Sequence, residues 1–265
     1  MTSASGKSGT LALFGASNQV GRALLKQLAG AWHIHAWSRS GAPANLNDVL
    51  WHQEALPGPI SLPAALDVLI YSAPMRYLPQ LLQRLPQLKC LVLVSSMSVT
   101  AKQRSPSTKE RALAAELRAG EDCAETWGQR TDTRVVIVRP TMIHGYGMDQ
   151  NLHRIRQFVR RFRFFPLPPP PYGLRQPIHA DEVAAIIVRA ISRESTRGVL
   201  EAGGSCRMSY DEMVARVFIE EGVTPRIMVL PRSLLKVLIG LQGGDPAVVD
   251  RIAQDQIAKR QELFS

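Results

Sequence analysis

The sequence predicts an α/β protein built on a doubly wound parallel sheet, with a smaller lobe in its C-terminal half. Three observations support this fold class. Short, nearly continuous apolar runs alternate with segments of helical periodicity, the first run ends in a turn bounded by two glycines, and the character of the chain changes after Arg139. Because strands covered on both faces by helices are apolar throughout, these features indicate a Rossmann-type core.

The first strand and the first helix are predicted near the N-terminus. Thr10–Phe14 is a short apolar run, and after a turn the residues Val20, Ala23, Leu24 and Leu28 recur on one helix face. Later apolar runs predict strands at Ile34–Trp37, Asp67–Tyr71, Cys90–Ser95 and Arg134–Arg139, and helical periodicity is found at Leu78–Leu85 and Glu110–Trp127. This order predicts repeated strand–helix units in one parallel sheet.

A lobe is predicted where this alternation stops. Asn151–Phe165 is a strongly basic stretch with interleaved apolar residues, and Pro166–Pro171 cannot continue a helix. Such a stretch either lies on an anionic surface, as in a peripheral membrane contact, or forms a lobe helix whose apolar face enters the core. We favour the lobe helix because the stretch leads directly from the residues expected to border a ligand.

The chain is then expected to return to the sheet. Asp181 is the expected N-cap of a helix through Ile191, Val199–Ala202 is typical of a strand, and Ser209 and Glu212 have the spacing of a capping box. We therefore expect a dinucleotide-binding core made of residues 1–145, completed by about 176–203, and a substrate lobe made of residues 146–175 and 204–265.

The composition limits the classes of function. A formal net charge of +10 suits nucleic acid, an anionic membrane surface or a phosphate-rich small ligand, but no nucleic-acid recognition motif accompanies it. No apolar run reaches the ~20 residues that span a bilayer. Cys90, Cys123 and Cys206 are widely spaced, which predicts buried thiols in a reducing, cytoplasmic compartment and no metal site. The sequence is also compatible with an oligomer.

The turn after the first strand predicts a dinucleotide site. It reads Gly15-Ala16-Ser17-Asn18-Gln19-Val20-Gly21, with one glycine directly after the strand and one where helix and strand pack closely. Backbone amides at such a helix start face a pyrophosphate. Asn18 takes the place of a middle glycine, and asparagine is the non-glycine residue that best tolerates a positive φ. The alternative is a strand-to-helix turn without a ligand.

The end of the second strand predicts which dinucleotide is bound. An acidic residue there would bind the ribose 2′-hydroxyl, but the sequence has Ser38 and Arg39 instead. An arginine binds a 2′-phosphate through charge-assisted hydrogen bonds, with help from Ser38 and Arg22. We therefore expect NADP, with NAD as the alternative if Arg39 is only a solvated surface residue.

At this point the sequence resembles the extended and atypical short-chain dehydrogenase/reductases, specifically the NAD(P)-dependent nucleotide-sugar epimerase/dehydratase family. The resemblance covers roughly residues 11–230. Besides the glycine turn, it depends on the segments Val68–Ala73, Leu93–Ser98, Val138–Gly145 and Gly173–Asp181. It implies a nicotinamide cofactor next to Ser72, Ala73, Ser95 and Pro140.

The resemblance also implies a substrate site. Gly173–Asp181 is similar to a family segment whose arginine binds the pyrophosphate of a nucleotide-sugar, and the matching residue is Arg175. Asn151 resembles the asparagine that opens a helix near those phosphates, and His144 lies in a segment expected to face the substrate. The alternative for Arg175 is a salt bridge with Asp181 or a neighbouring acid.

The sequence departs from the family at the proton-transfer residues. The family has a Tyr-x-x-x-Lys pair, but no tyrosine lies between Met97 and Trp127. One alignment places Ser105 and Lys109 at these positions. The other, which we favour because Pro106 interrupts a helix, places Leu113 and Leu117 there, with Glu121 four residues later.

Other side chains are therefore candidates for the catalytic role. Ser96 or Ser98 would bind a substrate oxygen, and Lys102 or Tyr146 would supply charge or a proton. Two functions follow from the sequence. The first is hydride-transfer chemistry, as a reductase or epimerase, on a nucleotide-linked sugar or a similar diphosphate. The second is a catalytically silent NADP(H)-binding regulator or scaffold.

Overall fold

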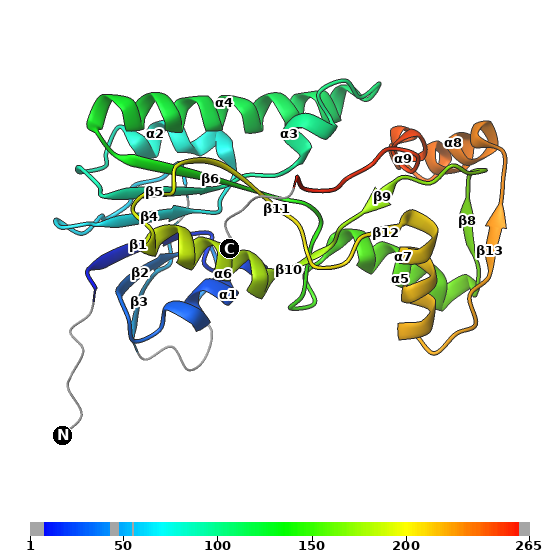
Figure 1. Ribbon diagram of the computed structural model, residues 1–265, viewed down its shortest axis with the longest axis horizontal. Helices are drawn as coiled ribbons and strands as arrows, with labels where there is room; N and C mark the ends of the chain where they lie inside the picture. The colour runs from blue at the N-terminus through cyan, green and yellow to red at the C-terminus, as the bar shows by residue number, and fades with distance from the viewer. Residues whose placement is uncertain (1–7, 43–47, 55, 260–265) are drawn as a thin grey trace. The chain divides into compact units, whose positions relative to one another are not determined.

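A computed structural model describes residues 8–42, 48–54 and 56–259 (Figure 1). The chain divides into two compact units. The first comprises residues 1–96, 115–140 and 180–202, and the second comprises residues 97–114, 141–179 and 203–265. The second unit thus includes residues 97–114, which we expected in the Rossmann core.

The first unit contains a seven-stranded parallel sheet in the described part of the chain. Its order is β11-β6-β5-β4-β1-β2-β3, in which β2 and β3 are added on one side of β1 and β4 and the later strands on the other. The strands are β1 (Thr10–Phe14), β2 (His33–Trp37), β3 (Val49–His52), β4 (Val68–Tyr71), β5 (Cys90–Val94), β6 (Arg134–Pro140) and β11 (Gly198–Ala202). The doubly wound parallel fold is therefore confirmed.

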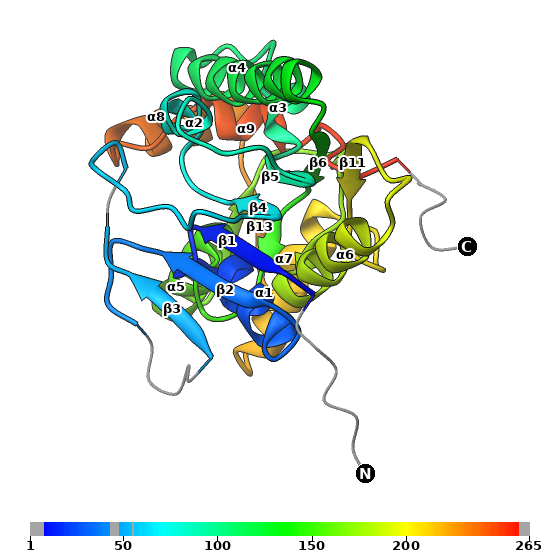
Figure 2. The same cartoon turned by 90° about the vertical axis from the view of Figure 1, so that its left-hand side faces the viewer.

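Helices cover both faces of this sheet. One face carries α1 (Gln19–Leu28) and α6 (Ala180–Ser192), and the other carries α2 (Leu78–Leu82) and α4 (Thr108–Thr131), as Figure 2 shows from the side. A short 3₁₀ turn, η1 (Met75–Tyr77), precedes α2. Side chains of β1, β4 and β5 pack against α2 and α4 in a core that includes Leu69, Leu78, Leu91, Ala124 and Trp127.

The second unit is built from short elements. It contains α3 (Ser98–Ala101), α5 (Gln150–Phe162), α7 (Tyr210–Glu220), α8 (Arg232–Leu241) and α9 (Ala247–Arg251). Three two-stranded ladders pair β7 (Ile143–His144) with β10 (Ile178–His179), β9 (Leu174–Arg175) with β12 (Met208–Ser209), and β8 (Phe165–Leu167) with β13 (Ile227–Val229). α5 and α7 share a small core that contains Ile155, Val159, Val214 and Phe218.

The two predicted lobe helices are present. The basic stretch forms α5, and its Ile155 and Val159 are buried, as the preferred interpretation requires. Its cations are partly neutralised, because Arg156 and Arg160 pair with Glu221 of α7. α7 begins with the predicted capping box between Ser209 and Glu212.

Three local expectations were wrong. α6 begins at Ala180, so Asp181 lies in its first turn and is not its N-cap. The short strand β3 was missed, because its four residues include a tryptophan, a histidine and an exposed leucine in place of an apolar run. Cysteine burial also differs, since Cys90 is buried, Cys123 is half-buried and Cys206 is exposed.

Candidate functional site

The glycine turn lies at the carboxyl end of β1 in the first unit. Gly15 has φ +84°, and a Cβ there would lie 2.2 Å from the carbonyl oxygen of Ser72. A Cβ on Gly21 would lie 2.3 Å from the carbonyl oxygen of Gly15. Both glycines are therefore required by the close approach of backbone segments, and the turn is held against the end of β4.

Asn18 has a different role from the one its sequence position suggested. Its φ of −75° is ordinary, so the positive φ that asparagine tolerates is not needed here. Its side chain accepts a hydrogen bond from the Gly21 amide at 2.8 Å, as the N-cap of α1, and donates to the Ser72 carbonyl oxygen at 2.7 Å. Asn18 thus connects the start of α1 to the end of β4 through its side chain, which a glycine at this position could not do.

The start of α1 fits a phosphate group. In the described part of the chain, the amides of Gln19 and Val20 have no acceptor, as is usual for a helix N-terminus. The side-chain oxygen of Gln19 is also buried and lacks a partner among these residues. If that amide group rotates, its NH₂ becomes available to a phosphate oxygen. These groups, with Gly15 and Gly21, could hold a dinucleotide pyrophosphate.

Two arginines and two serines gather where β2 ends. Ser38 is buried, and its hydroxyl donates to the Ser17 hydroxyl at 2.7 Å. Arg22 donates through Nε to the Ser17 carbonyl at 3.1 Å. Arg22 and Arg39 are both exposed, so their guanidinium groups are accessible to an anion beside this pair of serines.

The other predicted cofactor residues follow the carboxyl ends of neighbouring parallel strands. Ser72 and Ala73 follow β4, Ser95 follows β5, and Pro140 ends β6. The Ser95 hydroxyl makes a hydrogen bond within the protein, because it donates to the buried carboxylate of Glu121 at 2.6 Å. Sequence reasoning did not predict this use of Ser95.

Glu121 is the centre of a buried ionic cluster in the first unit. It is 1% exposed and accepts two hydrogen bonds from Arg139, from Nε at 2.8 Å and from Nη2 at 2.5 Å. This pairing raises the pKa of Arg139 above its ordinary value. Glu121 lies on α4 and Arg139 on β6, so the cluster ties the long helix to the sheet.

The two leucines that the favoured alignment places at the Tyr-x-x-x-Lys positions lie in α4. Leu113 and Leu117 lie inside α4, whereas Ser105 precedes the helix. Leu113 is 40% exposed, and Leu117 packs against the core of the first unit. Neither leucine can exchange a proton, so any proton transfer requires another side chain.

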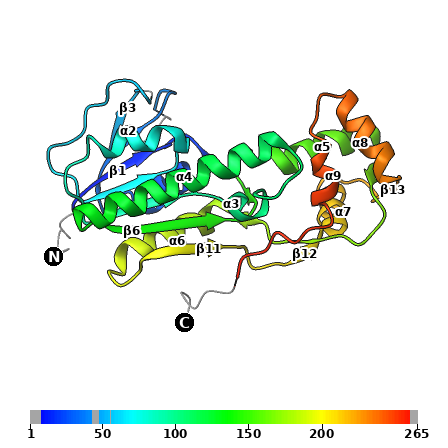
Figure 3. The same ribbon diagram turned by 90° about the horizontal axis from the view of Figure 1, so that it is seen from above.

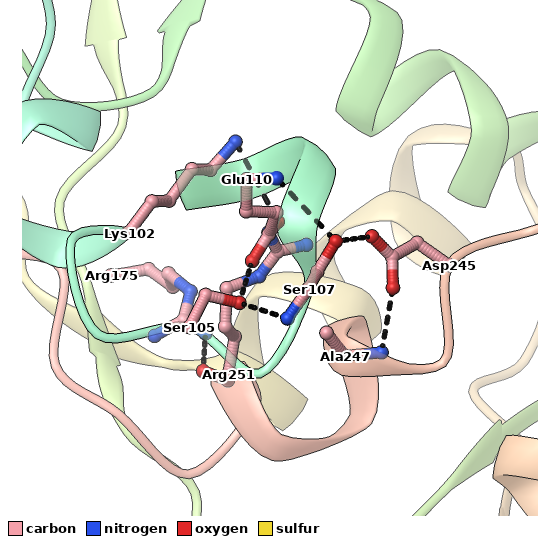
Figure 4. A network of polar contacts seen from close by, with 8 residues as sticks. All are labelled: Lys102, Ser105, Ser107, Glu110, Arg175, Asp245, Ala247 and Arg251. Atoms are coloured by element: carbon pink, nitrogen blue, oxygen red, sulfur yellow. Dashed lines mark hydrogen bonds and ion pairs between the residues drawn. The ribbon is translucent and has the colours of Figure 1, made fainter. Parts of the chain in front are cut away.

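Lys102 belongs to a polar network in the second unit (Figure 4). Its Nζ lies 3.7 Å from Oε1 of Glu110. The other carboxylate oxygen of Glu110, Oε2, accepts a hydrogen bond from Ser105, and Glu110 also pairs with Arg251. Burial, and then repulsion by Arg251, lower the pKa of Lys102, while Asp245 acts in the opposite direction. Ser96 follows β5, and Ser98 begins α3.

A pocket of about 320 Å³ opens beside this network in the second unit. Its lining includes Thr100, Gln103, Ser105, Pro106 and Arg251, and Ser105 is the serine that the less favoured alignment places at the tyrosine position. The described residues contain no group of three or more His, Cys, Asp and Glu side chains arranged for a metal ion.

Two histidines and a tyrosine meet in the second unit. The ring centroids of His144 and His179 are 5.2 Å apart, and that of Tyr146 is 6.1 Å from that of His179. Tyr146 is 37% exposed and has φ +57°, an uncommon value for a bulky residue. A Cβ on the intervening Gly145 would lie 2.4 Å from Nε2 of His179. Tyr146 is therefore held over an imidazole by a strained backbone.

Arg175 is buried, and its guanidinium group is bonded to the chain itself. Nη1 donates to the carbonyl oxygens of Leu174 and Gln254, and Nη2 donates to that of Arg251. The guanidinium carbon lies 5.0 Å from the ring centroid of Tyr210, and burial lowers the pKa of Arg175. Asn151, by contrast, is exposed on the first turn of α5.

The C-terminal segment is paired with the strand that carries Arg175. Gln256 donates to the Leu174 carbonyl at 2.8 Å, and Ala258 donates to Oε1 of Gln176 at 3.0 Å. Gly173 approaches so closely that a Cβ there would lie 2.2 Å from the Gln254 carbonyl. The arginine expected at a substrate diphosphate therefore anchors residues 251–258, an arrangement the sequence did not predict.

Comparisons with known proteins identify the fold. A UDP-glucuronic acid 4-epimerase variant from Bacillus cereus, in complex with a fluorinated UDP-sugar and NAD, has a TM-score of 0.68 at 16% identity, covering 84% of this chain and 86% of that one. A UDP-N-acetylglucosamine 4-epimerase from the same species has a TM-score of 0.64 at 12% identity, with the same coverage. An epimerase from Methanothermobacter thermautotrophicus has a TM-score of 0.66 at 12% identity, covering 84% and 80%.

At these identities the similarity establishes the fold alone, which this chain shares with those epimerase structures. No family model and no curated protein matches the sequence. None of the helices in the described part of the chain has the length and apolar composition that a bilayer crossing requires.

Proposed function

We propose that this protein binds a nicotinamide dinucleotide at the Gly15–Gly21 turn and uses it for hydride transfer on a nucleotide-linked sugar. The observation that carries the proposal is the geometry of the turn. Gly15 and Gly21 allow close backbone contacts, Asn18 fixes the start of α1, and the backbone amides of Gln19 and Val20 remain for a pyrophosphate. An epimerase structure of the same fold contains NAD and a UDP-sugar analogue, which supports the same use here.

NADP is the proposed form of the cofactor. Ser38 stands where a ribose-binding acid would, and the exposed Arg22 and Arg39 border it. Two guanidinium groups attract the charge of a 2′-phosphate, whereas a neutral 2′-hydroxyl offers them no opposite charge.

Equilibrium binding tests this cofactor assignment. NADPH is expected to bind more tightly than NADH, and Arg39→Ala should remove about 1.5–3 kcal/mol of that difference, the scale of a hydrogen bond to a charged group. Titration calorimetry at one ionic strength measures it, and Arg197→Ala, an exposed arginine of the same unit, is the matched control. Equal affinity of the parent for NADPH and NADH would contradict the assignment.

The bound cofactor supplies the hydride acceptor or donor, and the protein must position the substrate and move a proton. The proposed contact for the reacting oxygen is Ser96, which follows β5, or Ser98, which begins α3. Tyr146 is the proposed proton donor, because a phenol stacked on the imidazole of His179 can exchange a proton where Leu113 and Leu117 cannot. Lys102 is a weaker candidate, since Glu110 already pairs with it.

A second function is favoured by specific observations. The chain lacks the usual Tyr-x-x-x-Lys pair, and Arg175 is satisfied by backbone carbonyls. Both features suit a protein that binds NADP(H) and regulates or scaffolds a partner without turnover.

A substrate panel separates the two functions. NADP-loaded protein is titrated with UDP- and GDP-sugars, and epimer formation is followed by chromatography. Saturable binding with turnover that falls at least about 100-fold in Tyr146→Phe is expected, the usual contribution of general acid–base catalysis. Tyr172→Phe is the control. NADPH binding without saturable sugar binding would favour the regulator or scaffold.

A further inference from the structure

The helix α8 exposes an apolar face. Leu234, Val237, Leu238 and Leu241 have the i, i+3, i+4, i+7 spacing of one helix face, and they are 44%, 58%, 40% and 80% exposed. The opposite face packs on the protein through Leu235, which is buried. Such spacing normally marks the side of a helix that is covered, and here it is the outer side.

The preceding strand also exposes apolar side chains. Ile227, Met228 and Val229 of β13 are all exposed, and two residues later the chain enters α8 (orange in Figures 1 and 3). Half of the large hydrophobic side chains that are exposed in the described residues thus lie within residues 227–241. We call residues 227–241 the apolar ridge. Concentration of this kind marks an interaction site.

The charge around the ridge indicates what it contacts. Residues 224–244 contain Arg226, Arg232 and Lys236 but no acidic residue, and Lys236 pairs with Asp250 of α9 at 2.8 Å. The second unit holds 18 of the 32 Lys and Arg residues and 10 of the 22 Asp and Glu residues, which gives it +8 of the chain's +10. A second copy would bring an equal positive charge to the ridge, whereas an anionic surface attracts it.

We propose that the apolar ridge is a docking site for an anionic lipid bilayer. Leu234, Val237, Leu238 and Leu241 would enter the boundary between headgroups and acyl chains. Arg226 and Arg232, both exposed, would remain at the level of the lipid phosphates. This inference does not depend on the cofactor or on catalysis.

Vesicle sedimentation of the full-length protein tests the proposal. Vesicles of phosphatidylcholine with about 30 mol % phosphatidylserine are compared with pure phosphatidylcholine, because anionic lipid supplies the charge attraction. The parent protein should sediment with the anionic vesicles. Val237→Gln/Leu241→Gln should lower its partition coefficient at least about tenfold, since two apolar side chains lose their burial. Arg226→Gln/Arg232→Gln should lower binding to anionic vesicles only.

The matched control is Leu50→Gln/Ile219→Gln, because these side chains are 61% and 68% exposed and lie outside the ridge. The partition coefficient of this control variant on anionic vesicles should stay within about twofold of the parent's, because isolated exposed apolar residues do not form an interaction site. Equal binding by the ridge variant and the parent, or no binding to anionic vesicles at low salt, would overturn the proposal. A dimer that the ridge variant abolishes, without vesicle binding, would also overturn it and identify an interface between copies.

Discussion

Glu121→Gln is expected to lower the free energy of unfolding by about 3–5 kcal/mol, because it removes the hydrogen-bonded counter-charge of the buried Arg139 guanidinium. The carboxylate of Glu121 accepts from Ser95 and twice from Arg139, and both members of the ion pair are buried. A neutral amide keeps the size of the side chain and loses the charge. Urea unfolding followed by circular dichroism measures the change.

Two further variants make this test specific. Asp122→Asn removes an exposed acid from the next position of α4 and should change stability by no more than about 0.5 kcal/mol. Glu121→Leu/Arg139→Met replaces the pair with apolar side chains and should recover much of the loss, because both charges are then removed together. A loss below about 1 kcal/mol in Glu121→Gln would show that the pair is hydrated in solution.

Arg175→Ala is expected to destabilise the protein by about 2–4 kcal/mol, because it removes three hydrogen bonds from a buried charged donor and takes away the guanidinium partner of the Gln254 carbonyl. The loss should be concentrated at the C-terminus, since the carbonyls belong to Arg251 and Gln254. Hydrogen exchange should accelerate at the amides of Gln256 and Ala258, which are bonded to the neighbouring strand.

The same variant tests the sugar-binding role of Arg175. Arg175→Lys should recover only part of the stability, because a single ammonium cannot reach the same carbonyls in a planar fork. Arg154→Ala, an exposed arginine of α5, is the control. Unchanged stability together with lost UDP-sugar binding would show that Arg175 contacts substrate and that its carbonyl contacts contribute little.

The sequence was most informative where burial imposes a simple pattern. The strands β1, β4, β5 and β6 are apolar runs because both faces of the sheet are covered, and the capping box of α7 is local in sequence. Such features depend on neighbouring residues only. Prediction failed at β3, which lies at the sheet edge and therefore tolerates Trp51, His52 and an exposed Leu50.

The site was predictable in its backbone and less so in its side chains. The glycines of the turn follow from steric rules, but the contact of Asn18 with Ser72 joins residues 54 positions apart. The partners of Arg175 are carbonyl groups 76 and 79 residues later, and every residue type carries a carbonyl. No sequence pattern therefore distinguishes this arginine from one that binds a phosphate.

The position of β11 at the edge of the sheet has a consequence for synthesis of the chain. β6 pairs with β5 on one side and with β11 on the other, yet β11 ends 62 residues after β6. At ribosomal rates of about 5–20 residues per second, the apolar edge of β6 stays uncovered for roughly 3–12 s. During that interval the nascent chain presents an open strand of valine and isoleucine, a template for pairing with other chains. Chaperone binding to the nascent chain should therefore be strongest between the synthesis of β6 and that of β11.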